Sequence, residues 1–171
     1  MLTLLAAVLA APAALAQETP AGFRDEFMGK FNYAAQRLVA LAEAMPEAAY
    51  GWRPGGGVMS VEEVYMHIAR YNYYYPESSL GIKAPEDVDV PNLESITGKA
   101  VVVEHLRRSL AHVREAVEPM TEEDLRRSAT LYGRDTQAWA VLFQLLTHLS
   151  EHLGQSIAYA RTNGVVPPWS Q

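Results

Sequence analysis

The chain has 171 residues, of which 49% are hydrophobic and 20% charged, an ordinary composition for one globular domain. The formal net charge is −6 and no stretch concentrates lysine or arginine, so no nucleic-acid partner is expected. Cysteine is absent, which excludes disulfides, a thiolate nucleophile and thiolate metal ligands. Any bound metal must therefore sit on nitrogen and oxygen ligands.

The first sixteen residues, MLTLLAAVLAAPAALA, are uncharged and apolar, and they end in the small-x-small sequence Ala14-Leu15-Ala16. This pattern predicts a signal peptide over 1–16, cleaved after Ala16, and a periplasmic or secreted protein comprising 17–171. The segment is too short for a stable membrane anchor. Because a basic stretch before the apolar run is missing, a buried first helix is the alternative.

The first strong helical pattern covers 23–45, and Pro46 ends it. A turn rich in glycine and proline follows at 54–57. Ser60 then has Glu63 three residues later, a capping box that predicts the start of a second helix over 60–75.

Residues 76–96 are rich in proline, serine and acidic residues and have no period. A crossover loop of this length is uncommon in a compact domain and usually functional, so we expect it to cover a site. A third helix is predicted over 97–117, and Thr121 with Asp124 predicts a short capped turn. The apolar residues that this third helix offers to the core are Val101, Leu106, Leu110, Val113 and Val117.

The last helix is predicted to begin at Asp135 or Thr136 and to end near Asn163, with Gly164 as its C-terminal cap. No pair of strands joined by a hairpin turn is expected. Four long helices predict an all-α fold, a four-helix bundle with a long crossover loop between the second and third helices.

The last helix is apolar nearly all round, which predicts a central position in the bundle. Yet it carries a polar stripe within an arc of about 80°. Buried polar groups are costly unless they are partnered, so the stripe calls for an explanation. Its members are Gln144, His148, His152, Gln155 and Tyr159.

Two histidines four residues apart on one helical face can bind the same ion. His67 lies on the second helix, and facing helices of a bundle can complete such a site. We therefore predict that His67, His148 and His152 hold one metal ion. A lone His67 is otherwise explained as a hydrogen-bonded core residue. His105 and His112 stand among arginines, which favours a solvated face.

The string HLSEH at 148–152 also matches the inverted zinc-protease motif, in which Glu151 would be the general base. Glu151 points about 100° away from His152 on a helix, and no acidic residue follows it as a third ligand. The protease interpretation therefore fails, and Glu151 is expected to lie near the ligands or on the surface.

Three neutral imidazoles leave a divalent ion with its full charge and an open position. Such ligation suits Zn, Ni, Cu, Fe or Co, and we favour Zn, Ni or Fe. The catalytic candidates are Glu63, Tyr71 and Gln155, although no acidic residue is convincingly placed as a base. Each candidate has a purely structural alternative. Further candidates for the pocket are Asn32, Tyr74 and Gln144.

Two long segments resemble the DinB superfamily of bacterial four-helix-bundle proteins. They are LAEAMPEAAYGWRPGGGVMSVEEVYMHIA at 41–69 and LLTHLSEHLGQSIAYARTNGVVPP at 145–168. The resemblance implies that the three matching histidines, His67, His148 and His152, ligate one divalent metal. Some family members resemble transferases that use mycothiol or bacillithiol, some isomerise, and many have no assigned reaction. Because those thiols are cytosolic, export argues against their use here.

The sequence thus predicts an exported DinB-like metal protein, either a hydrolase or a transferase acting on an unknown small substrate. Two alternatives stay open: a non-catalytic periplasmic module that binds metal or a ligand, and a structural bundle that forms a homodimer. Whether the protein is an enzyme is left open at this point.

Overall fold

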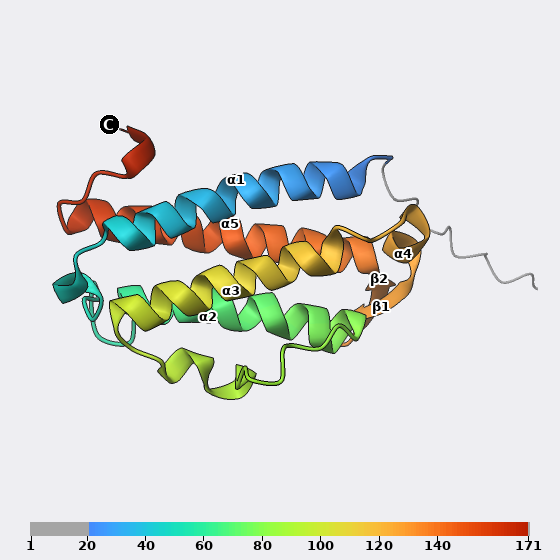
Figure 1. Cartoon of the computed structure of the whole chain (residues 1–171), viewed down its shortest axis with the longest axis horizontal. Coiled ribbons are helices and arrows are strands. Elements are labelled where there is room, and N and C mark those ends of the chain that lie inside the picture. Colours follow the sequence, from blue (N-terminus) through green and yellow to red (C-terminus); the bar gives the residue numbers. More distant parts are fainter. Residues whose placement is uncertain (1–20, 171) are drawn as a thin grey trace, which may run out of the picture.

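The computed structural model of the protein describes residues 21–170, so the predicted signal peptide at 1–16 lies outside the described residues. Within them, no helix is both long and apolar enough to cross a membrane. The predicted all-α class is confirmed, because four long helices dominate the structure (Figure 1). They are α1 (Phe23–Ala44), α2 (Val61–Tyr75), α3 (Lys99–Val117) and α5 (Ala138–Thr162).

Each long helix packs against two others. Helix α2 contacts α3 and α5, while α1 contacts α5 and α3, so the α2–α5 and α1–α3 seams lie on opposite sides of the bundle. The core between them is built from aliphatic and aromatic side chains of all four helices. Helix α5 is buried along much of its length, although Phe143 is 54% exposed.

The capping signals predicted from sequence are present. Ser60 and Glu63 form a complete capping box at the start of α2. Thr121 and Asp124 do the same for the short helix α4 (Glu122–Arg126). Gly164 follows α5 with a φ of 73°, the left-handed conformation of a helix C-terminal cap.

The crossover between α2 and α3 is more regular than the sequence predicts. Helix α2 continues into a π-helical turn, η2 (Pro76–Leu80), and a 3-10 helix, η3 (Val90–Ser95), packs against α2. These pieces are too short for a helical period to be visible in sequence. A second 3-10 segment, η1 (Glu47–Ala49), links α1 toward α2.

The expectation of no strand pair is wrong. β1 (Ser128–Leu131) pairs antiparallel with β2 (Arg134–Gln137). Tyr132 and Gly133 between them have φ angles of 53° and 73°, as a type I′ hairpin turn requires. The strand signal is short: β1 alternates over only four residues, and all four residues of β2 are polar. Tyr-Gly is also a weaker turn signal than Asn-Gly. Because β2 occupies this stretch, α5 begins at Ala138 rather than at Asp135 or Thr136.

The outer face of α3 also differs from the prediction. Val101 is 50% exposed and Val102 takes its place in the core. His105 and His112 are half-buried rather than solvated. The ring of His112 lies 4.9 Å from the ring of Tyr73 on α2, and burial lowers the pKa of His112.

Candidate metal centre

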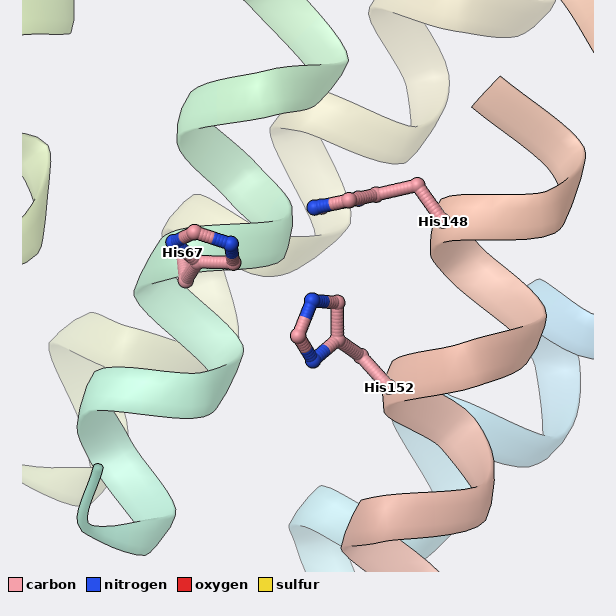
Figure 2. Close-up of side chains that lie close together, drawn as sticks. All are labelled: His67, His148 and His152. Carbon is pink, nitrogen blue, oxygen red and sulfur yellow. The ribbon is translucent and has the colours of Figure 1, made fainter. Parts of the chain in front are cut away.

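The three predicted histidines meet at the seam between α2 and α5. Figure 2 shows His67 reaching across from α2 toward His148 and His152 on α5. One candidate ligand nitrogen from each ring lies within 4.8 Å of the other two. The ring centroids are 4.5 Å apart for His148 and His152, 4.8 Å for His67 and His152, and 5.1 Å for His67 and His148.

His148 lacks a hydrogen-bond partner of the kind that a buried polar atom normally has. Its Nε2 atom is buried and contacts no donor or acceptor within residues 21–170. Buried polar atoms are normally paired, so an orphaned ring nitrogen that faces two further imidazoles calls for a partner such as an ion. The donor set and this orphaned nitrogen therefore fit a divalent metal ion.

Burial keeps the two α5 histidines in the neutral form that binds metals. Burial, followed by the neighbouring His152 and His67, lowers the pKa of His148 to about 3. Burial also lowers the pKa of His152, although a hydrogen bond to Gln155 opposes this effect. The two residues are only 7% and 8% exposed, so water solvates a charged ring poorly and both pKa values stay low.

Two of the three rings are oriented by hydrogen bonds on the side away from the cluster. The Nδ1 atom of His67 lies 2.7 Å from a carboxylate oxygen of Glu94, and that of His152 lies 2.8 Å from Oε1 of Gln155. Oxygen atoms of this kind accept, so both Nδ1 atoms donate and each Nε2 atom keeps its lone pair. Metal-binding histidines usually have such an outer partner.

The cluster adjoins an open cavity of about 450 Å³ on the α2 side. In a tetrahedral zinc site the ligand nitrogens lie about 3.3 Å apart, so small side-chain rotations suffice to close the observed cluster around an ion. The cavity offers both charge signs beside His67, the one histidine of the three that lines it. It is lined by Met59, Glu63, His67, Arg70, Tyr71 and Glu94.

Two of the three catalytic candidates lie beside the histidines. The ring of Tyr71 is 4.7 Å from the ring of His67 and 4.8 Å from that of His148. Gln155 is bonded directly to His152. These contacts place both side chains at the edge of the cluster.

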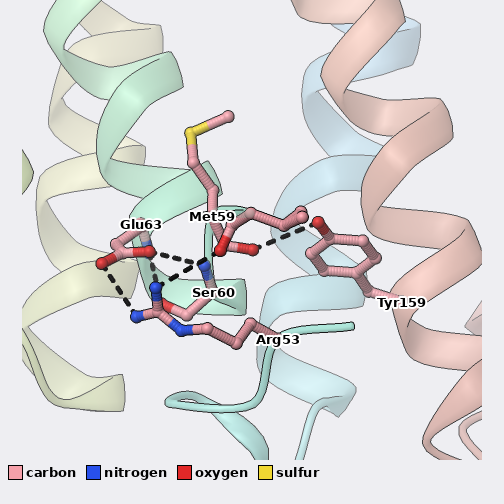
Figure 3. A network of polar contacts seen from close by, with 6 residues as sticks. Arg53, Met59, Ser60, Glu63 and Tyr159 are labelled. Atoms are coloured by element: carbon pink, nitrogen blue, oxygen red, sulfur yellow. Dashed lines mark hydrogen bonds and ion pairs between the residues drawn. The ribbon is translucent and has the colours of Figure 1, made fainter. Parts of the chain in front are cut away.

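Glu63 has a different role from the one that a base requires. One carboxylate oxygen accepts from the backbone N–H of Ser60 at 2.6 Å and the other accepts from Arg53 at 3.0 Å (Figure 3). The Ser60 bond, assisted by Arg53, lowers the pKa of Glu63. A weaker base with both oxygens engaged is suited to holding the start of α2 rather than to abstracting a proton.

The remaining pocket candidates lie at varying removes from the histidines. Tyr74 lines a separate cavity of about 220 Å³ beside the hairpin. Burial raises the pKa of Tyr75, and the nearby Gln144 partly offsets that rise. Asn32 accepts a hydrogen bond of 2.7 Å from Arg114 at the α1–α3 seam, opposite the histidines. The prediction that Asn32 lines the metal pocket is therefore wrong, because helical spacing does not show which neighbouring helix a residue faces.

Sequence reasoning did not identify Glu94, the partner of His67. Glu94 lies in η3 of the crossover segment, whose sequence has no period to single it out. The only available signal was the expectation that this segment covers a site. Glu151 is exposed on α5, in accord with the rejection of the protease interpretation.

Comparisons with known proteins agree with this architecture. A family model described as the DinB superfamily matches residues 30–156. No curated protein matches the chain. A solved DinB-like protein from Bacillus cereus ATCC 10987 is similar, with a TM-score of 0.74 at 18% identity over 84% of this chain and 95% of that one.

Two further solved structures share the fold. A conserved protein from Enterococcus faecalis has a TM-score of 0.66 at 16% identity, covering 80% of this chain and 94% of its own. A DinB-like protein from Bacillus subtilis has a TM-score of 0.57 at 23% identity, covering 87% and 96%. At these identities the likeness concerns the fold alone.

Proposed function

This chain belongs to the DinB superfamily, and from that premise we propose that it binds one divalent transition metal ion through His67, His148 and His152. One observation carries the proposal: three histidine nitrogens converge within 4.8 Å at a buried seam. The orphaned Nε2 of His148 supports it further. Imidazole ligands favour Zn, Ni or Fe over the harder cations Mg and Ca.

We further propose that the protein is exported and acts as a hydrolase or a transferase on a small substrate. When bound, the ion would supply a Lewis acid that polarises a substrate oxygen or sulfur and activates water. The adjoining cavity supports access by a small molecule, with the Tyr71 ring beside His67 and the cation of Arg70 paired with Glu94 at 3.6 Å. Glu94 holds His67 in orientation from the far side.

One observation favours the non-catalytic alternative. Glu63, the acidic candidate for a base that the sequence suggested, has both oxygens engaged by Ser60 and Arg53. Under this alternative the protein is a periplasmic module that binds a metal or ligand without turnover.

Elemental analysis of the purified protein tests the metal site, and a substrate screen with and without chelator tests the activity. We expect about one equivalent of Zn, Ni or Fe per chain and a hydrolytic or transfer activity that the chelator removes. Metal without any turnover would support the binding module. Absence of metal, even after incubation with zinc, would overturn the site. Sequencing of the mature N-terminus tests export, which predicts Gln17 as the first residue.

Replacing Glu94 with alanine should weaken zinc binding about tenfold, because His67 loses the acceptor that orients its ring. The affinity can be measured by competition with a chromophoric chelator. Glu86→Ala is the matched control, since it removes an exposed carboxylate from the same crossover segment. An equal loss of affinity in both variants would show that general charge, and not the His67 contact, is responsible.

A further inference from the structure

A chain of hydrogen bonds leads from His152 to the backbone in front of α2. Gln155 contacts Nδ1 of His152 through Oε1 at 2.8 Å, and its Nε2 lies 3.0 Å from the Tyr159 hydroxyl. That hydroxyl lies 3.1 Å from the carbonyl oxygen of Met59, as Figure 3 shows. The chain thus joins two elements that are far apart in sequence.

The direction of every bond in this chain follows from its far end. A carbonyl oxygen only accepts, so the single proton of the Tyr159 hydroxyl is donated to Met59. The hydroxyl oxygen must then accept from Gln155, which directs the amide N–H₂ toward Tyr159 and the amide oxygen toward His152. An amide oxygen also only accepts, so His152 must carry its proton on Nδ1.

The Met59 carbonyl is itself held in place. It shares one planar peptide unit with the N–H of Ser60, and in a trans peptide these two groups point in opposite directions. Glu63 accepts from that N–H at 2.6 Å, and Arg53 secures Glu63 at 3.0 Å (Figure 3). The carbonyl of the same unit is therefore directed toward Tyr159.

The tyrosine ring is also firmly placed. Tyr159 is 8% exposed, and the indole of Trp52 packs edge-on against it with ring centroids 5.3 Å apart. Removing only its hydroxyl should therefore leave the ring where it is. This separates the hydrogen-bond function of Tyr159 from its packing.

We infer that the Met59–Ser60 peptide, clamped by Glu63, sets the tautomer of His152 through Tyr159 and Gln155. This tautomer leaves the lone pair on Nε2, the nitrogen available to the cluster. Tyr159, Gln155 and Glu63 are thus positioning residues for a ligand, and none of them needs to touch the ion. The effect of this tautomer on metal binding rests on the proposed function. The tautomer itself follows from the hydrogen bonds alone.

The decisive experiment measures the tautomer of His152 by ¹⁵N NMR on the full chain without metal at neutral pH. The wild-type protein should show the proton on Nδ1. In Tyr159→Phe the Gln155 amide is free to turn over, and a substantial share of His152 should move its proton to Nε2. Zinc affinity, measured by chelator competition, should fall about tenfold.

A second variant provides rescue. In Tyr159→Phe combined with Gln155→Glu, a carboxylate faces His152 and can only accept, so the proton should return to Nδ1 and zinc affinity should recover. Tyr50→Phe is the matched control, because it removes another buried hydroxyl bonded to a backbone carbonyl, that of Ala42 at 2.7 Å. The control should change neither reading.

An unchanged tautomer in Tyr159→Phe, or an equal change in Tyr50→Phe, would overturn the inference. The proposed metal site fails differently: if wild-type protein binds no zinc while the tautomer follows the predicted pattern, only the proposed function is lost. If the tautomer shifts as expected while zinc affinity stays constant, the tautomer of His152 does not control zinc binding. That result would overturn the positioning role of Tyr159 and Gln155.

Discussion

Replacing His148 with leucine is expected to abolish metal binding while making the metal-free protein more stable. His148 supplies one of the three converging nitrogens, so its loss leaves an incomplete site. The same nitrogen is buried and lacks a partner in the part of the chain that the structure describes. A buried unpaired polar atom costs about 1–3 kcal/mol, and an apolar side chain removes that cost.

Urea unfolding with and without zinc measures both effects. Without metal, His148→Leu should gain about 1 kcal/mol in free energy of unfolding. With zinc at a hundredfold excess over its dissociation constant, the wild-type protein should gain about 2.7 kcal/mol and the variant nothing. A variant that still carries one equivalent of metal would contradict the assignment of His148 as a ligand.

His112→Leu is the matched control for this variant. Its Nε2 atom is also buried and has no hydrogen-bond partner within the described residues, but it lies on α3 away from the cluster. The control should gain stability in a similar way and keep its metal. Loss of metal in both variants would point to a global effect on the bundle.

Acidification is expected to destabilise the metal-free protein through His148. Its pKa is lowered from 6.5 to about 3 in the folded state, chiefly by burial and then by His152 and His67. The unfolded chain therefore binds the proton more readily, and stability falls as pH drops from about 6.5 toward 3. Between about pH 7 and pH 5, His148 alone should remove about 2 kcal/mol.

The pH dependence can be measured by urea unfolding of chelator-treated protein at several pH values. The lowered pKa of His152 acts in the same direction. In His148→Leu the free energy of unfolding should fall less steeply below about pH 6.5. The difference in slope against pH should correspond to about one bound proton. Identical pH profiles for the wild-type protein and this variant would contradict the assigned pKa of His148.

Local features of this protein were determined by the sequence itself. The capping boxes of Ser60 and Thr121 and the cap at Gly164 depend on residues three or four positions apart, and all are present. The pairing of His148 with His152 follows in the same way, because one helical turn separates them. Helix count and fold class also depend on such short-range periodicity.

Only the tertiary structure decided which of these local pieces meet. Packing of α2 against α5 places His67 beside His148 and His152. Packing of α1 against α3 places Asn32 beside Arg114, on the opposite side of the bundle. Packing of η3 against α2 places Glu94 within hydrogen-bond distance of His67. The packing around α3 left His105 and His112 half-buried. These contacts join residues that no local period relates, since burial depends on the whole bundle.

Glu63 illustrates the difference between the two levels. Its spacing marked it both as a helix cap and as the acid nearest His67. The structure shows that the cap engages both carboxylate oxygens, because Arg53 arrives from the preceding loop. Whether a carboxylate can act as a base depends on what else contacts it, and the folded chain alone determines those contacts.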